Sequence, residues 1–172
     1  MKKVSLKLAL TVLLSLAAAL AAGAAQGSGD YLNEQEVDRV REAQEIELRT
    51  RVFLFIAERR LKVLTGELKQ QSKKDEELWG PLPTGAPAFL LEGYGRSISE
   101  LMDKLDDAHE RDPKAEGLKK ALKRLLDGTD QHLKSLATLR AQLTDPEVRR
   151  AIDRAEEAAR LANEGARSGA AK

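Results

Sequence analysis

The sequence predicts an all-α protein, an antiparallel helical bundle of about four long helices plus a short N-terminal helix. Three observations predict this class. Alternation of apolar and polar residues, the pattern of a half-buried strand, is nearly absent. Apolar residues spaced alternately three and four apart recur in four segments, and this period keeps an apolar stripe on one face of neighbouring helices. Prolines and glycines gather between those segments, where helices end.

The first 24 residues have the layout of a secretory signal peptide. Three lysines precede an apolar run over residues 8–20, and small residues follow it. We expect cleavage after Ala24 or Ala25. Because the run is shorter than the roughly 20 apolar residues that span a bilayer, we expect no stable membrane span after processing. The expected location is periplasmic or extracellular.

The mature chain carries little net charge. The leader contains three of the 29 basic residues and no acidic one, which leaves 26 basic against 28 acidic side chains, a formal charge of −2. This balance gives no electrostatic case for a nucleic-acid partner. With no cysteine, the fold depends on its core alone. We expect one bundle domain over residues 33–166, between a flexible N-terminus (25–32) and a disordered tail (167–172).

Apolar seams mark the four long helices. They run through residues 54–68, 91–108, 118–143 and 148–162. Asp112 and Asp145 each precede a proline, and we expect both aspartates to cap the helix that follows. The last seam consists mainly of alanines, which bury less surface than leucines, so we expect that helix to fray beyond Leu161.

Glycines and prolines leave open where several helices begin and end. The segment 75–88 contains LWGPLPTGAP, which no helix is expected to cross, and its Trp79 and Leu82 are expected to cover one end of the bundle. The second long helix could begin before Gly93 or at Ser97, which starts a capping-box pattern. The third seam keeps its phase past Gly128, which favours one continuous helix of about 30 residues.

The stretch from Asn33 predicts the short first helix. Asn33 and Glu36 have capping-box spacing, and the apolar stripe that follows is interrupted. We therefore expect a bend near residues 44–47 before the next helix. The apolar run 53–57 faces nearly every direction of a helix, so either the first helix covers it or another chain does.

The N-terminal stretch also carries a resemblance. YLNEQEVDRVREAQE, followed by Arg49 and FLFIAERRL, resembles a pattern of exported bacterial helical proteins that have no assigned activity. The pattern Y-L-x-x-x-E-x-D-x-x-R-x-A-Q recurs in them, and the resemblance covers about 30 of the 172 residues. It implies export and a helical fold. This sequence has Ile46 where those proteins often carry proline, so the bend is less firmly imposed.

Two interpretations of this stretch remain open. In the structural one, salt bridges from Asp38 or Glu42 to Arg41, Arg49 or Arg59 hold the first helix down. In the functional one, the stretch forms an interaction surface for a partner, made of Glu36, Asp38, Arg41, Gln44, Arg49, Phe53, Phe55, Arg59 and Arg60.

Catalytic chemistry has little support in the sequence. Metal-centred bundles need carboxylates that project inward, and none of the four seams holds Asp or Glu. We therefore predict no catalytic residue, no metal ligand and no cofactor. His132 is expected at the edge of the core with a local hydrogen bond, and His109 is expected to be exposed near a helix end. The lysine-rich face over 114–124 is interpreted as a solvated helix face.

These observations favour an exported, non-enzymatic helical bundle that acts through protein–protein contacts, with a protein partner or by self-association. One alternative is a periplasmic stress chaperone resembling the Spy and CpxP group. Its Leu-Thr-x-x-Gln motif is approximated twice here, without the glutamine, by residues 32–36 and 143–147. The other alternative is a metal-binding bundle enzyme that uses His109, His132, Asp106 and Asp130.

Overall fold

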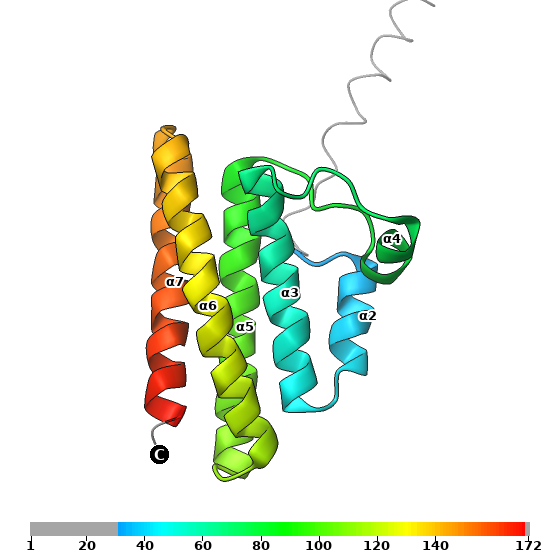
Figure 1. Ribbon diagram of the computed structural model, residues 1–172, viewed down its shortest axis with the longest axis vertical. Coiled ribbons are helices and arrows are strands. Elements are labelled where there is room, and N and C mark those ends of the chain that lie inside the picture. Colours follow the sequence, from blue (N-terminus) through cyan, green and yellow to red (C-terminus); the bar gives the residue numbers. More distant parts are fainter. Residues whose placement is uncertain (1–30, 171–172) are drawn as a thin grey trace, which may run out of the picture. The chain divides into compact units, whose positions relative to one another are not determined.

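The computed structural model describes residues 31–170 as six α-helices with no strand in that range (Figure 1). They are α2 (Glu34–Glu42), α3 (Ile46–Thr65), α4 (Lys73–Trp79), α5 (Pro87–Arg111), α6 (Glu116–Gln142) and α7 (Pro146–Ala170). The all-α prediction is confirmed, but α4 was not predicted. The predicted signal peptide, with Ala24 and Ala25, lies outside the described residues. None of the helices from residue 31 onward combines the length and apolar character that crossing a bilayer requires.

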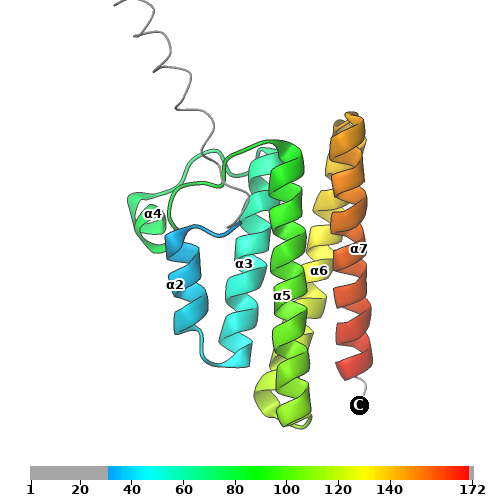
Figure 2. The ribbon, with the colours of Figure 1, turned by 180° about the vertical axis from the view of Figure 1, so that it is seen from behind.

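The four long helices lie side by side as a bundle (Figures 1 and 2). α3 packs against α5 and α6, and α7 packs against the same two helices. The predicted seams supply one continuous core, in which α5 and α6 contribute mainly leucines and α7 contributes mainly alanines. The buried alanines of α7 are Ala151, Ala155, Ala159, Ala162 and Ala166.

Local capping signals set several helix starts as predicted. The Asn33 side chain accepts a hydrogen bond from the Glu36 amide at 2.8 Å, and the Glu36 carboxylate accepts one from the Asn33 amide at 3.3 Å. The Asp145 carboxylate accepts hydrogen bonds from the amides of Glu147 and Val148 at 2.9 and 3.0 Å, so it caps α7. The chain bends between α2 and α3, as predicted.

One predicted cap is wrong, and the structure decides where the second long helix begins. Asp112 does not cap α6, which begins at Glu116. Its carboxylate instead accepts a hydrogen bond from the Lys114 amide at 3.0 Å, in the turn that follows α5. α5 does not begin at Ser97 but runs unbroken through Gly93 from Pro87. The continuous helix past Gly128 is confirmed.

The proline-rich connection contains more structure than predicted. Its first part forms α4, and the Ser72 hydroxyl caps this helix by accepting a hydrogen bond from the Asp75 amide at 3.1 Å. The chain from Gly80 to Ala86 is non-helical, as predicted. Trp79 packs on the flank of α3, where it contacts Phe55 and the small buried cluster around Ile56, and not over an end of the bundle.

Helical structure and packing contacts also reach further toward the described ends of the chain than expected. α7 continues to Ala170, into the stretch 167–172 that we expected to be a disordered tail, and Ala166 in its last turns is buried. Tyr31 and Leu32 belong to the segment expected to be flexible. Leu32 packs against the Ile56 cluster, and the Tyr31 ring lies beside two guanidinium groups.

Candidate interaction surface

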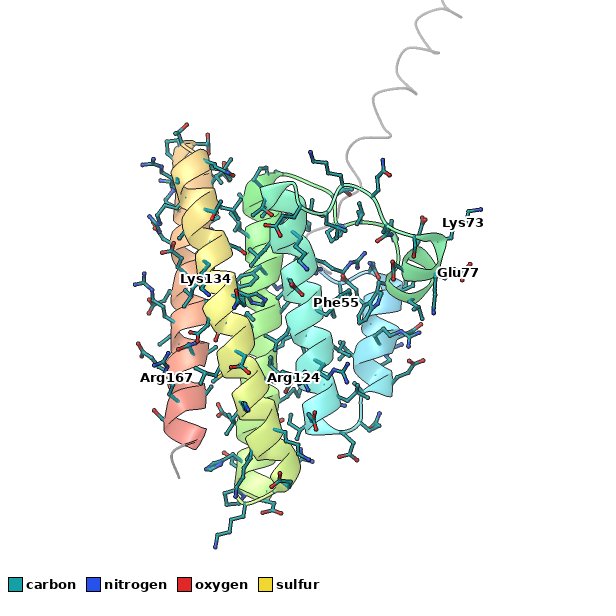
Figure 3. All side chains as sticks on the ribbon, in the orientation of Figure 1. Phe55, Lys73, Glu77, Arg124, Lys134 and Arg167 are labelled. Atoms are coloured by element: carbon teal, nitrogen blue, oxygen red, sulfur yellow. The ribbon has the colours of Figure 1, made fainter. Side chains whose placement is uncertain are left out.

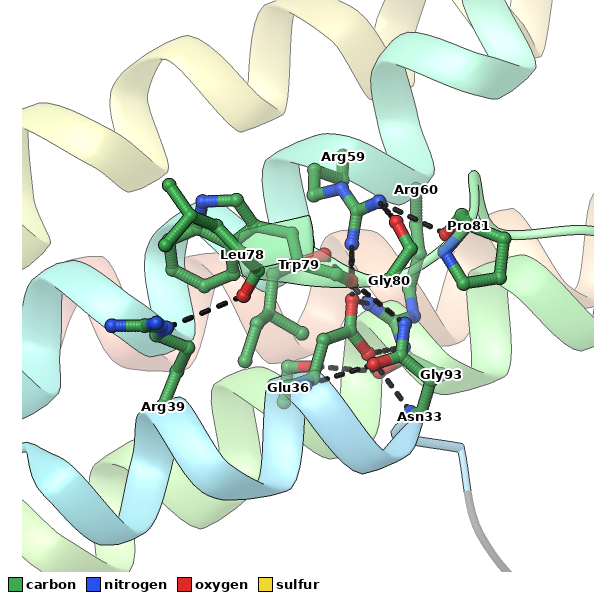
Figure 4. Close-up of polar contacts among 12 residues, drawn as sticks. Asn33, Glu36, Arg39, Arg59, Arg60, Leu78, Trp79, Gly80, Pro81 and Gly93 are labelled. Carbon is green, nitrogen blue, oxygen red and sulfur yellow. Dashed lines mark hydrogen bonds and ion pairs between the residues drawn. The ribbon is translucent and has the colours of Figure 1, made fainter. Parts of the chain in front are cut away.

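A buried carboxylate joins α2 to α3. Glu36 is 1% exposed, and Arg59 and Arg60, from the neighbouring α3, are each 3% exposed. Glu36 Oε1 accepts a hydrogen bond from Arg59 Nη1 at 2.9 Å, and its Oε2 accepts one from Arg60 Nη2 at 3.0 Å (Figure 4). A carboxylate out of water requires such charged partners. We call these three residues the buried ion triad.

Arg59 extends the triad to the connection after α3. Its guanidinium donates to the main-chain carbonyls of Trp79, Gly80 and Pro81 at 2.9, 3.2 and 3.0 Å. It also donates to Gln71 Oε1 at 3.2 Å. Burial lowers the pKa of Arg59 from its ordinary value, and the Glu36 carboxylate opposes that shift. One side chain thus binds both flanks of α4 to the bundle.

Arg60 connects the triad to the start of the described chain. Its guanidinium donates to the carbonyl oxygens of Tyr31 and Ile56. It also lies 5.7 Å from the centre of the Tyr31 ring, and the Arg96 guanidinium lies 5.0 Å from the same ring. Such cation–π contacts hold the aromatic ring in place. Burial and then the nearby Glu100 carboxylate raise the pKa of Tyr31.

Arg60 can follow this path because α5 carries glycine where the side chain passes. A Cβ at Gly93 would lie 2.9 Å from Arg60 Nε and 3.6 Å from the Tyr31 Cβ. Gly95, two residues later, has open space where its Cβ would be. Gly93 is therefore a packing requirement of the buried ion triad.

The structure divides the nine residues of the predicted surface into three groups. Glu36, Arg59 and Arg60 form the buried ion triad and Phe53 lies in the main core, so these four face no partner in the folded protein. The Arg49 side chain is half-buried and donates to the Ala43 carbonyl at 2.8 Å. The side chains that remain exposed are Asp38, Arg41, Gln44 and Phe55.

Of the salt bridges expected in the structural interpretation, the pair of Asp38 with Arg41 forms, but Arg59 uses a different acid. Arg59 pairs with Glu36 and not with Asp38 or Glu42. Asp38 pairs with Arg41 at 3.5 Å, and both side chains are more than two-thirds exposed, at 67% and 76%. Such an exposed pair contributes about 0–1 kcal/mol. Among these contacts, the buried ion triad holds α2 in place.

Phe55 is the one aromatic residue of the apolar run that reaches the surface. Val52 and Ile56 are covered by α2, Leu32 and Trp79. The first helix therefore helps to bury the apolar run, which was one of the two expected possibilities. Phe55 is 38% exposed, and its ring lies 4.3 Å from the Trp79 ring, centre to centre, at a tilt of 43°. Figure 3 shows Phe55 on the side of α3 toward α4.

Two grooves meet at Phe55. The first lies between α3 and α6, has a volume of about 630 Å³, and includes Leu54, Phe55 and Gly128. The second lies between α3 and the α4 region, has a volume of about 470 Å³, and includes Phe55, Leu68 and Trp79. We call the surface that contains both grooves the Phe55 face. The sequence carried a signal for this face. Positions 48, 51, 55, 58 and 62 share one side of a helix, and that side sets Leu48 and Phe55 among the charged residues Arg51, Glu58 and Lys62.

The histidines and acids of the metal-enzyme alternative do not converge. His132 is buried, and its Nδ1 lies 3.3 Å from the Tyr94 hydroxyl. Burial lowers the pKa of His132 to about 4, so it is neutral at pH 7. His109 is exposed in the last turn of α5, as predicted, and the Asp130 carboxylate accepts a hydrogen bond from Asn163. Within residues 31–170, no three His, Asp or Glu side chains are placed to share a metal ion.

The chain matches no protein-family model, no curated protein and no solved structure.

Proposed function

We propose that this protein is exported to the periplasm or beyond the cell and acts there, without catalysis, through contacts with other proteins. Its four long helices would alternate in direction and serve as a rigid support for the contact surface. The leader-like first 24 residues and the resemblance to exported helical proteins support the proposed location.

The observation that carries the proposal is the fixed position of an exposed aromatic side chain. A single exposed apolar residue is ordinary on a protein surface. Phe55 differs because Trp79 contacts its ring, and because the Trp79 carbonyl is held by Arg59 and Asn33, both at 2.9 Å. Rigid aromatic residues beside grooves are typical anchors of protein interfaces, because little conformational freedom is lost on binding.

Phe89 provides a matched control for a test of this surface. It lies on α5 and is 41% exposed, close to the 38% of Phe55. A photo-crosslinking amino acid would replace each phenylalanine in turn, in cells that export the protein. We expect a discrete cross-linked protein from position 55 and none from position 89. Equal yields at both positions, or no product at position 55, would remove the support for the Phe55 face as a contact surface.

The same experiment addresses the chaperone alternative. A chaperone that binds many unfolded clients would give a broad smear of products from position 55, whereas a dedicated partner gives one species. The location is tested separately by sequencing the N-terminus of the protein recovered outside the cytoplasm. We expect it to begin at Ala25 or Gln26, the residues that follow the two expected cleavage positions.

A further inference from the structure

The groove between α3 and α6 has an apolar floor and charged walls. Leu54 and Phe55 supply the floor, and Arg51 and Glu47 stand on the α3 side. The α6 wall carries three cations and one acid: Lys120, Lys123, Arg124 and Asp127. Figure 3 labels Phe55 on α3 and Arg124 on α6.

Some of these charges already have partners within the protein. Arg124 pairs with Glu47 at 3.1 Å, and Glu58 pairs with Lys62 at 2.8 Å. Lys120 makes only a long contact, 3.9 Å, with Glu116. Among the described residues, no carboxylate lies within 4.0 Å of the charged groups of Arg51 or Lys123.

We infer that this groove binds an acidic amphipathic segment of a partner protein. An apolar side chain of that segment would lie on Leu54 and Phe55, and its carboxylates would face Arg51 and Lys123. Apolar residues with carboxylates beside them, repeated along one helix face, give this arrangement. The inference depends on the proposed function, because it specifies the chemistry of the protein that contacts the Phe55 face.

The mixed charges of the groove argue against a membrane or a nucleic acid as its ligand. Its four cations are Arg51, Lys120, Lys123 and Arg124, and its three acids are Glu47, Glu58 and Asp127, so its net charge is 4 − 3 = +1. Anionic membranes and phosphate backbones attract surfaces with several uncompensated cations. A protein segment can instead place each carboxylate opposite one cation and avoid the acids.

Synthetic peptides can test the charge preference directly. Two helical peptides of about five turns would share one stripe of leucines and contain no tryptophan. Glutamates would flank the stripe in the first peptide, and lysines would flank it in the second. Trp79 is the only tryptophan of the protein and its ring contacts Phe55, so its fluorescence reports binding beside that ring. We expect the glutamate peptide to bind the wild-type protein about tenfold or more tightly than the lysine peptide.

A charge-reversal variant makes the test decisive. Arg51→Glu combined with Lys123→Glu should reverse the preference, so that the lysine peptide binds more tightly. The matched control is Arg150→Glu with Arg154→Glu, which changes the net charge equally but on the exposed side of α7. This control should keep the wild-type preference. Circular dichroism of each variant verifies that it is folded.

Several results would overturn the inference. They are equal binding of both peptides, binding of neither, or the same preference in the Arg51/Lys123 variant as in wild type. A cross-link at position 55 together with any of these results would leave the proposed function in place and reject only the acidic partner. Absence of the cross-link would count against the proposed function itself.

Discussion

Replacing Glu36 by alanine tests whether the buried ion triad holds the fold together. The substitution leaves two guanidinium groups, each 3% exposed, without their carboxylate. Removing one partner of a buried ion pair costs about 3–5 kcal/mol, a large share of the roughly 5–15 kcal/mol that stabilises a typical domain. With a urea dependence of roughly 2 kcal/mol per molar, a loss of about 4 kcal/mol lowers the unfolding midpoint by about 2 M.

Asp38 is the matched control, because it is an acid on the same helix with a partner at the surface. Its pair with Arg41 is more than two-thirds exposed, so Asp38→Ala should cost about 0–1 kcal/mol. Urea unfolding would be followed by circular dichroism at 222 nm and by Trp79 fluorescence, which reports on the segment that Arg59 binds. If the two alanine variants unfold within about 1 kcal/mol of each other, the triad does not stabilise the fold as we argue.

Three further predictions concern the core, α5 and α7. His132 is neutral and buried, with its pKa lowered from 6.5 to about 4, so stability is retained above pH 6.5 and falls as pH drops toward 4. The loss of unfolding free energy attributable to His132 is about 3 kcal/mol at pH 4. It is measured by urea unfolding at each pH, as the difference between wild type and His132→Gln. Identical pH profiles of the two proteins would contradict the prediction. Gly93→Ala should destabilise the protein by about 1–3 kcal/mol, because the added methyl clashes with Arg60. Gly95→Ala, where the methyl enters open space, should stabilise the protein by about 0.5–1 kcal/mol. Thermal unfolding compares the two variants, and equal shifts of their melting temperatures would refute the clash. Amide hydrogen exchange in α7 should be fastest beyond Leu161, because alanine methyls bury little surface; slow exchange there would show that Ala162 and Ala166 hold the end more firmly than their size suggests.

The sequence predicted those parts of the fold that depend on neighbouring residues. Helix seams depend on spacing within one segment, and the cap formed by Asn33 and Glu36 depends on residues three apart. The same local reasoning failed at Asp112, where α5 continues to Arg111 and the chain then needs a turn before α6 can begin. The seven-residue α4 escaped prediction because it is too short to carry a repeating apolar stripe.

The candidate site was harder to predict because its contacts join distant segments. Arginines are mostly exposed in proteins, and nothing local shows that Arg59 and Arg60 are buried against an acid 23 and 24 residues earlier. A signal was nevertheless present, since the two arginines closely follow the apolar run 53–57, most of which is buried. The free charges of Arg51 and Lys123 could not have been found, because the pairing of α3 with α6 brings them to one groove.

Arg59 links the buried ion triad to the Phe55 face through its contact with Trp79. α2 has only nine residues, fewer than the roughly 12–15 at which even favourable isolated helices become marginally stable in water, so tertiary contacts must hold it. Arg59 supplies those contacts to Glu36 and, through the same guanidinium, to the carbonyl of Trp79. Because Trp79 contacts Phe55 and lines the groove between α3 and the α4 region, the guanidinium that secures α2 also positions one wall of that groove. The buried Arg59 therefore positions a surface aromatic residue as well as stabilising the fold. An apolar replacement could fill its volume but could not bind three carbonyl groups at once.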